Sequence, residues 1–417
     1  MSQRHLTQRI NAKLRRGMGP FGSVAGGSAL GQIALALSLP VTARIYPPAD
    51  LGAFAVVLAY AQVAAIVITG RLEQVLPRLE AGRRWVATRL VLVTGIALAP
   101  VSAIVILALA GRLATLEAVF AGALVASICL YNTGTYALLA ERQYRRVAVL
   151  RITNGVVTAS AQIVFGLLLP EVWVLLATYA AGNVVATLVA VPAVRKIRRV
   201  SGGEPARLVI REERLGRFVA SVGTGAVLSN LGLALPVVGV SMLFGDAAAG
   251  SFWLARRLLM VPTQLLAHAV NEVTYAIAAR QSVHDVARMA YGWLRKAKWA
   301  ALALLVVGTA SAPLVPIIVG EGYQSIAWVM VFLSASAAAQ LVATSFSNVL
   351  LVLRMEVVRT AWYLGRLIGL LVIFVWAQAS GASFMAAVGL FAAYTVVSYG
   401  VLLWLTFRGL RTGEVTD

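Results

Sequence analysis

The chain has 417 residues, of which 60% are hydrophobic and 12% are charged, and its formal net charge at pH 7 is +20. An average soluble domain is about 25% charged and about 45–50% apolar, whereas nearly uncharged stretches of 18 or more residues recur along this chain. These values exclude a soluble globular protein and predict an all-α polytopic membrane protein. The single cysteine, Cys129, lies in an apolar stretch, which excludes a disulfide framework.

The first apolar run follows a basic leader, "MSQRHLTQRINAKLRRG", and extends from about Met18 to Ile45. A signal peptide has an apolar region of only about 7–15 residues, so we expect a retained first helix. Eleven further runs have about 20 residues each, which is enough to cross a hydrocarbon core about 30 Å thick. The twelve predicted spans are 19–45, 51–70, 90–111, 116–138, 148–168, 172–192, 217–243, 248–277, 299–319, 325–352, 359–379 and 383–407.

The connections between the predicted spans alternate in length and charge. One set is short, such as "PPAD", "PE" and "GDAA", and the other set is longer and rich in lysine and arginine. The positive-inside rule assigns the basic set, and with it both termini, to the cytoplasm. The net charge therefore reflects topology, with contacts to anionic membrane lipids, and no nucleic-acid partner is expected. We predict a multi-pass protein of a bacterial cytoplasmic membrane.

The longest basic connection, "RKIRRVSGGEPARLVIREERLGR", falls at the midpoint of the chain. The two halves share a short repeat, since "LSLPVTARIYPPADLGAF" resembles "LALPVVGVSMLFGDAAAGSF". The matched pairs are Pro40 and Pro236, Asp50 and Asp246, Gly52 and Gly250, and Phe54 and Phe252. Such a repeat predicts two six-helix lobes, residues 1–195 and 217–417, joined by a cytoplasmic loop at 196–216 and related by an axis along the membrane normal.

Polar residues within the spans are the candidates for function, and the first is Arg44, beside "IYPPAD". Its alternatives are an interfacial anchor and a contact to a ligand. Several amides also fall in the apolar runs, and we expect most of them to hydrogen-bond between helices. They are Gln32, Asn132, Asn154, Gln162, Asn183, Asn230, Gln340 and Asn348. Small residues in "GSVAGGSALG" predict close helix packing in the first span.

The eighth span carries a polar stripe on one face. Counted along a helix of 3.6 residues per turn, that face holds Arg257, Gln264, His268, Asn271 and Glu272. An arginine at a helix centre in a bilayer costs about 2.5–3.5 kcal/mol, so such residues usually face a bundle interior or a wet cavity. Arg256 points about 100° away from Arg257, and each of the two arginines either lines the cavity, snorkels to the membrane surface or bridges to a carbonyl group at the end of another helix. Pro262 predicts a kink within the stripe.

The remaining intramembrane charge is Arg366 in the eleventh span, seven residues beyond Arg359, which either lines the cavity or snorkels. Glu272 either pairs with an arginine or titrates with a coupling ion, a proton or sodium. The intramembrane charges are thus three arginines and one acid. Because guanidinium groups match phosphate oxygens, the cavity should bind an anionic ligand such as a lipid-linked diphosphate, with its glycan in the cavity and its tail in lipid.

An enzyme is not expected. The turns opposite the basic connections carry only scattered acids, Asp50, Glu117, Glu171, Asp246 and Glu321, and no His, Cys or Asp cluster has the spacing of metal ligands. Without an extramembrane domain there is no place for a water-filled active site. The sequence therefore predicts neither a metal nor a cofactor, and a non-transporting scaffold remains as another alternative.

Three motifs resemble a known family. They are "LSLPVTARIYPPADLGAFAV", "GRLEQVLPRLEAG" and "NLGLALPVVGVSMLFGDAAAGSFWLARRLLMVPTQLLAHAVNEV". Together they resemble the polysaccharide and oligosaccharide flippases of the O-antigen type, in the MOP exporter superfamily, over essentially the whole chain. Carried over by position, the family pattern falls on Arg44, Asp50, Gly52 and Phe54, on Arg71, Glu73 and Pro77, and on Ala255, Arg257 and Pro262. Leu72 departs from it, since the family has tyrosine there.

The resemblance implies twelve helices around a basic cavity and transport of an undecaprenyl-diphosphate-linked repeat unit from the cytoplasmic to the outer leaflet by alternating access. It also implies cooperation with other polysaccharide assembly proteins. Two transporters remain as alternatives. A multidrug and toxin extruder would be expected to concentrate acids in its cavities, and a peptidoglycan-precursor flippase would be expected to have fourteen helices.

Overall fold

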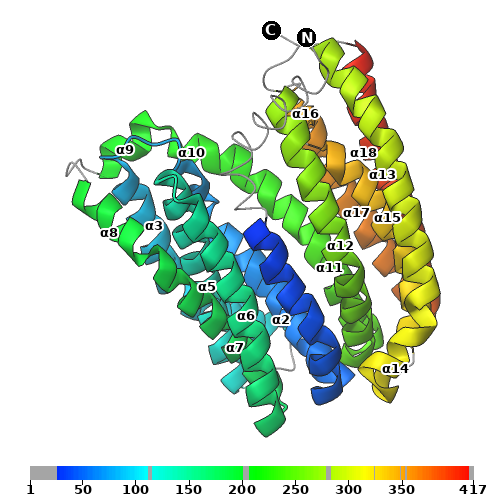
Figure 1. Cartoon of the computed structure of the whole chain (residues 1–417). Coiled ribbons are helices and arrows are strands. Elements are labelled where there is room, and N and C mark those ends of the chain that lie inside the picture. The colour runs from blue at the N-terminus through cyan, green and yellow to red at the C-terminus, as the bar shows by residue number, and fades with distance from the viewer. Residues whose placement is uncertain are drawn as a thin grey trace, which may run out of the picture.

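The computed structural model describes residues 26–110, 115–200, 206–278, 283–323, 325–347, 349–352 and 355–412. These residues are helical or lie in turns, and none of them forms a strand. Figure 1 shows long helices arranged as two groups that stand side by side, closer together near α14 and further apart near α9 and α16. The predicted all-α fold is confirmed.

The first helix group is the half of the chain up to the midpoint. It contains the helices Gly26–Ile45, α2 (Pro48–Thr69), η1 (Leu72–Val75), α3 (Arg84–Ala97), α4 (Ala99–Ala110), α5 (Thr115–Ala140), α6 (Tyr144–Leu168), α7 (Val172–Thr187), η2 (Leu188–Ala190) and α8 (Val191–Val200). Two short helices, α9 (Ala206–Glu212) and α10 (Leu215–Phe218), form the linker. A π-helical turn, η3 (Val219–Gly223), joins the linker to the second half.

The second helix group follows that turn. It contains α11 (Thr224–Phe244), α12 (Asp246–Ala278), α13 (Val283–Ser311), η4 (Ala312–Leu314), α14 (Val315–Val319), η5 (Glu321–Tyr323), α15 (Ile326–Phe346), α16 (Val349–Val352), α17 (Glu356–Ser380) and α18 (Phe384–Thr412). The exact boundaries of the two predicted lobes, and the side of the membrane on which the termini lie, stay predictions.

Ten helices of the described residues are long and apolar enough to cross a membrane, or eleven if α3 and α4, which meet at an angle of 46°, form one span. These match eleven of the twelve predicted spans. The remaining predicted span is α12, a helix of 33 residues that Arg256, Arg257 and Gln264 make less apolar. On the outer faces of the spans, large apolar side chains such as Leu167 and Trp328 are more than half exposed, as a surface solvated by lipid requires.

Glycines bring helices into close contact inside the first helix group. Gly27 and Gly31 of the first described helix lie directly on the backbone of α6, at Ala148 and Arg151, and Gly155 of α6 lies on Gly31. None of these three glycines has room for a Cβ atom. The packing role predicted for the small residues of "GGSALG" is therefore confirmed at Gly27 and Gly31.

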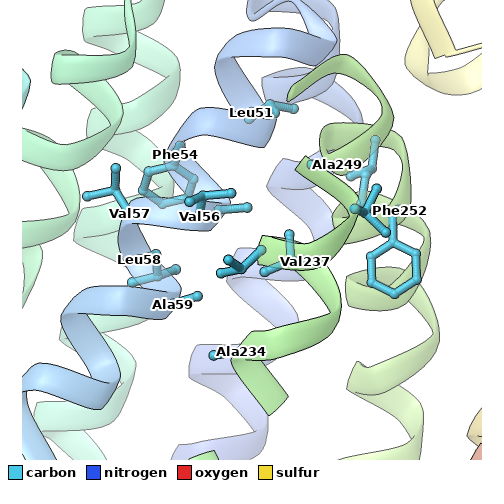
Figure 2. Close-up of a cluster of buried hydrophobic side chains, with 14 of the residues drawn as sticks. Leu51, Phe54, Val56, Val57, Leu58, Ala59, Ala234, Val237, Ala249 and Phe252 are labelled. Carbon is cyan, nitrogen blue, oxygen red and sulfur yellow. The ribbon is translucent and has the colours of Figure 1, made fainter. Parts of the chain in front are cut away.

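The two helix groups meet along α2, which packs against both α11 and α12. Figure 2 shows the apolar cluster at this contact, with Leu51 and Phe54 on α2, Val237 on α11, and Ala249 and Phe252 on α12. All five side chains are less than 5% exposed. This buried cluster aligns the repeated segments of the two halves against each other.

The molecule has two ends of different chemistry. The short-turn end holds the turns before α2, α12 and α15, and the basic end holds the connection 70–83 and the linker residues 206–214. At the basic end, Arg83 pairs with Glu212 at 2.7 Å and Glu213 at 3.0 Å. These contacts fasten the linker to the first helix group.

Candidate substrate cavity

The first site of interest is a cavity between the two helix groups, which we call the main cavity. It has an empty volume of about 760 Å³, including the part that is open to solvent. Its walls come from α2, α11 and α12, with one residue from α15. The lining residues are Ala55, Leu58, Ala59, Gln62, Leu233, Ala234, Val237, Trp253, Arg256, Arg257, Met260, Gln264 and Gln340.

Two adjacent arginines of α12 supply the formal charge of the main cavity. Arg256 donates a hydrogen bond of 2.7 Å from Nη1 to the carbonyl oxygen of Leu233, which fixes its direction toward α11. Arg257 is half-buried and forms no hydrogen bond or ion pair with the residues that the structure describes. No aspartate or glutamate is among the described lining residues. Among the described lining residues, the positive charge of the cavity therefore has no acidic partner.

The internal repeat places equivalent residues of the two halves on the walls of the main cavity. If Gly52 is aligned with Gly250, and Phe54 with Phe252, the alignment continues without a gap along α2 and α12. The lining residues then pair as Ala55 with Trp253, Leu58 with Arg256, Ala59 with Arg257, and Gln62 with Met260. The two helices thus use the same four positions, but only α12 places charge there.

A smaller space, which we call the second cavity, lies inside the second helix group. Its empty volume is about 300 Å³. Its lining residues come from α12, α15, α17 and α18 and are Arg256, Leu259, Met260, Leu333, Ser336, Ala337, Gln340, Arg366, Phe391 and Thr395. Arg256, Met260 and Gln340 line both cavities, so they form the wall between them.

Arg366 lies in the second cavity and does not line the main one. The whole residue is only 6% exposed. Its guanidinium carbon lies 4.8 Å from the ring centre of Tyr399 and 5.6 Å from that of Trp362. Its buried Nε has no hydrogen-bond partner among the described residues. Aromatic faces stabilise a cation in part, but they leave the N–H donors of the guanidinium unsatisfied.

The predicted polar stripe of α12 is described only in its first part. Arg257 and Gln264 lie together on the wall of the main cavity, with Arg256 beside them. The side chains of His268, Asn271 and Glu272 lie outside the residues that the structure describes, so their predicted roles stay predictions. Pro262 lies inside α12, which continues through it as one helix.

Arg44 lies at the short-turn end, away from the lining residues of both cavities. It donates hydrogen bonds from Nε to the carbonyl oxygen of Ile318 at 2.7 Å and from Nη2 to that of Ile317 at 3.0 Å. These are carbonyls at the C-terminal end of α14, where a positive charge is favoured. In this structure Arg44 therefore joins the first described helix to α14, and its predicted contact with substrate stays a prediction.

The short-turn end is closed by a crossing of α2 and α12, which we call the glycine crossing. Gly52 lies on the carbonyl of Asp246, and Gly250 lies on the carbonyl of Pro48. A Cβ atom at either glycine would overlap the backbone of the other helix. Beside it, the rings of Phe54 and Trp253 meet edge to face with centroids 5.8 Å apart.

A hydrogen bond adds to this closure. The hydroxyl of Tyr323 in η5 donates to the carbonyl oxygen of Tyr46 at 3.1 Å, and both residues are 1% exposed. The short-turn end is therefore sealed, and the main cavity lies on the other side of the glycine crossing.

Sequence reasoning placed Glu73 in the family pattern but did not predict that this acid is buried. The turn at Gly70 and Arg71, both at positive φ (54° and 61°), folds η1 back under the helices. Glu73 is 1% exposed, and its Oε1 lies 3.7 Å from Nη1 of Arg71. Burial raises the pKa of this carboxyl group, and the charge of Arg71 opposes part of the shift. The apolar spacing of "LEQVL" was the available signal.

Two buried amides of the first helix group are hydrogen-bonded between helices, whereas Oε1 of Gln32 has no hydrogen-bond partner among the described residues. Asn154 donates from Nδ2 to Oδ1 of Asn183 at 2.8 Å, and Asn183 donates from Nδ2 to Oγ of Ser127 at 3.1 Å. This chain links α6, α7 and α5, as we expected for the buried amides. Within the described residues, no group of three or more His, Cys, Asp or Glu side chains could hold a metal ion.

No protein-family model matches the chain, and no curated protein sequence matches it. Solved structures do. An inward-facing multidrug resistance MATE family transporter of the MOP superfamily is 14% identical with a TM-score of 0.64, covering 95% of this chain and 96% of that one. A MATE in complex with MaL6 is 15% identical with a TM-score of 0.68, covering 95% and 97%. The lipid II flippase MurJ, in an inward closed conformation, is 10% identical with a TM-score of 0.68, covering 94% and 89%.

At these identities the likeness shows the fold alone. The chain thus has a fold that is shared by MATE transporters and a lipid flippase, with many apolar spans. Its structural neighbours are transporters rather than enzymes, in keeping with the predicted lack of catalysis.

Proposed function

We propose that the protein is a flippase for a polyprenyl-diphosphate-linked oligosaccharide, which it moves from the cytoplasmic to the outer leaflet for cell-surface polysaccharide biosynthesis. The observation that carries this proposal is the charge of the main cavity. Arg256 and Arg257 line it, and no described lining residue is acidic. Arginine binds phosphate oxygens through paired N–H donors, so this cavity suits a diphosphate better than a cation.

The rest of the cavity supports a glycan beside the diphosphate. Gln62, Gln264 and Gln340 line it from three different helices and offer both donors and acceptors to sugar hydroxyl groups. Trp253 adds an aromatic face of the kind on which sugar rings pack. The apolar polyprenyl chain would stay in the surrounding lipid, which is equally apolar.

Transport by alternating access would use the two ends in turn. The glycine crossing and the Tyr323–Tyr46 hydrogen bond close the short-turn end. If the basic end is cytoplasmic, as the charge of its connections predicts, the closed end faces outward and the cavity is loaded from inside. Export then requires α2 and α12 to separate at the glycine crossing.

A cation extruder is the second candidate, because MATE transporters share the fold with TM-scores of 0.64 and 0.68. A cationic drug would meet two unneutralised guanidinium groups in the main cavity, which repel it. The charge of the cavity therefore favours the flippase. The lipid II flippase MurJ shares the fold as well, so the identity of the lipid-linked glycan has to come from experiment.

The test is mass spectrometry of lipid extracts from a strain that lacks the protein. We expect one polyprenyl-diphosphate oligosaccharide to accumulate and the wild-type chain to clear it. Arg257→Ala should slow clearance about tenfold to a hundredfold, because a charge-assisted hydrogen bond contributes about 1.5–3 kcal/mol. The control is Arg145→Ala, which removes an exposed arginine at the start of α6.

Each other outcome points elsewhere. An unchanged lipid profile with new sensitivity to cationic drugs would support the extruder, and accumulation of a peptidoglycan precursor would identify the other lipid flippase. Full clearance by Arg257→Ala, at wild-type levels in the membrane, would overturn the proposed role of this arginine.

A further inference from the structure

The second cavity contains an arginine, Arg366, that the proposed transport of a diphosphate does not use. Arg256 and Arg366 both line this cavity, from α12 and α17. Arg366 is 6% exposed, and its buried Nε has no hydrogen-bond partner among the described residues. Two like charges that line one small space repel each other. This arrangement needs a negative partner.

The surrounding helices do not supply that partner within the described residues. No aspartate or glutamate is among the residues that line the second cavity. The nearest acids along the two arginine-bearing helices are at their first positions. Asp246 begins α12 and Glu356 begins α17, each ten residues before its arginine, which is about 15 Å along a helix. Asp246 already accepts a hydrogen bond from Ser241.

The second cavity is also lined by two polar residues other than the arginines, and one of them has an atom without a partner. Thr395 of α18 is 3% exposed, and its Oγ1 has no hydrogen-bond partner among the described residues. Gln340 of α15 lines the same cavity with its amide. A hydroxyl, an amide and the N–H groups of two guanidinium groups are all donors. Four helices thus contribute donors to one space.

The size and walls of the second cavity limit what can bind. Its empty volume of about 300 Å³ is well under half of that of the main cavity, about 760 Å³. Leu259, Leu333 and Phe391 form apolar walls. A diphosphate with an attached glycan is too large for this space, and a cation is repelled by it.

We propose that the second cavity is a binding site for a small monovalent inorganic anion, such as chloride, held between Arg256 and Arg366 with Thr395 and Gln340 as further donors. The bound anion neutralises Arg366 and sits behind Arg256, so it orients the wall that the two cavities share. This inference concerns a cavity other than the proposed substrate site and does not depend on the identity of the transported molecule.

The first test is thermal unfolding of the purified full-length protein in detergent, with sodium chloride, bromide, nitrate, sulfate or gluconate at equal ionic strength. We expect chloride, bromide and nitrate to raise Tm in a saturable way relative to gluconate, because a ligand of the folded state stabilises it. Sulfate should do less, since it is divalent and larger. Potassium in place of sodium should change nothing.

Variants assign the effect to the site. Arg366→Gln should raise the half-saturating chloride concentration roughly tenfold or more, from the loss of charge-assisted hydrogen bonds. The matched control is Arg359→Gln, the same change on the same helix and outside the second cavity, and it should leave the chloride response unchanged. If Arg366→Gln does not fold, Thr395→Val replaces it with the same expected direction.

A bromide-soaked crystal measured at the bromine absorption edge locates the anion directly. A peak between Arg256 and Arg366 supports the proposal. A Tm that does not depend on the anion, an unchanged chloride response in Arg366→Gln or Thr395→Val, or a bromide peak only in the main cavity overturns it. None of these outcomes affects glycan-lipid clearance by the wild-type chain, so failure here is distinct from failure of the proposed function.

Discussion

The two helix groups place different polar residues inside the membrane-spanning part. In the first group these include the amides Asn154 and Asn183, which are joined by the hydrogen bonds from Asn154 to Asn183 and from Asn183 to Ser127. In the second group, Arg257 and Arg366 have no described hydrogen bond or ion pair. Since the two groups meet through repeated segments, the difference lies in side chains and not in architecture. One half supplies a neutral wall and the other supplies charge.

The contact between the halves is symmetric where the cavity is not. At the glycine crossing each repeat presents a glycine to the backbone of the other. Six and seven residues further on, Leu58 and Ala59 face the main cavity from α2, while their counterparts on α12 are Arg256 and Arg257. A repeat can therefore fix the docking of two helices while the site beside it becomes specialised. The following predictions test the two parts of this comparison.

The largest effect is expected from the symmetric part. Gly52→Ala and Gly250→Ala should each reduce the population of the closed short-turn end about tenfold or more, because overpacking costs about 1–3 kcal/mol. The measurement is the rate at which Leu51→Cys, in a Cys129→Ala background, reacts with a membrane-impermeant maleimide. Leu51 is 1% exposed in the closed structure.

Gly232→Ala is the matched control, since a Cβ there meets no described atom within 4 Å. It should leave the rate unchanged. Strongly unequal effects of the two crossing glycines would contradict the symmetry.

An intermediate effect is expected from moving charge between the halves. Arg256→Leu should slow glycan-lipid clearance, and Leu58→Arg in the same chain should restore part of it, several-fold, because position 58 faces the same cavity from α2. The rate of lipid clearance in cells measures this. Rescue by Leu58→Arg would show that the cavity needs charge at its wall and not on one particular helix. No rescue, with normal membrane levels, would mean that the bond from Arg256 to Leu233 sets an indispensable direction.

The smallest effect concerns the buried acid of the first helix group. Burial raises the pKa of Glu73 in the folded protein, so its proton stabilises the fold at low pH, and this contribution is lost as pH rises through the raised pKa. Glu73→Gln, which is neutral at every pH, should therefore raise Tm by a few degrees at pH 8 and have no effect at pH 4. Thermal unfolding across this range measures the difference.

Glu80→Gln is the control, an exposed acid in the same connection. A Tm difference between Glu73→Gln and wild type that shrinks with rising pH would reverse the assignment and favour a strong ion pair with Arg71.

The helices and the charged stretch of α12 could be predicted from the sequence, because length, hydropathy and helical spacing are properties of one segment. The partners of a side chain cannot be predicted in this way, because they depend on other segments of the chain. Arg366 was predicted in a common cavity with Arg257, yet packing between α17 and α18 puts it against Tyr399 in a separate space. Arg44 reaches carbonyls of α14 more than 270 positions away. Nothing in the sequence predicts that Leu58 and Ala59 line a cavity, since apolar residues occur throughout a membrane-spanning segment.

The glycine crossing also explains which part of the internal repeat is still recognisable in the sequence. If both halves descend from one duplicated unit, neither Gly52 nor Gly250 can gain a side chain, because a Cβ atom at Gly52 would overlap the carbonyl group of Asp246 and one at Gly250 would overlap that of Pro48. Selection then keeps glycine in both copies at this point, whereas the residues a turn or two further along each helix can change separately. The internal repeat is accordingly recognisable from "LxLPV" to "GxF", and the two sequences are no longer similar where α2 and α12 line the main cavity. The remaining similarity between the halves therefore lies where α2 and α12 are in direct contact.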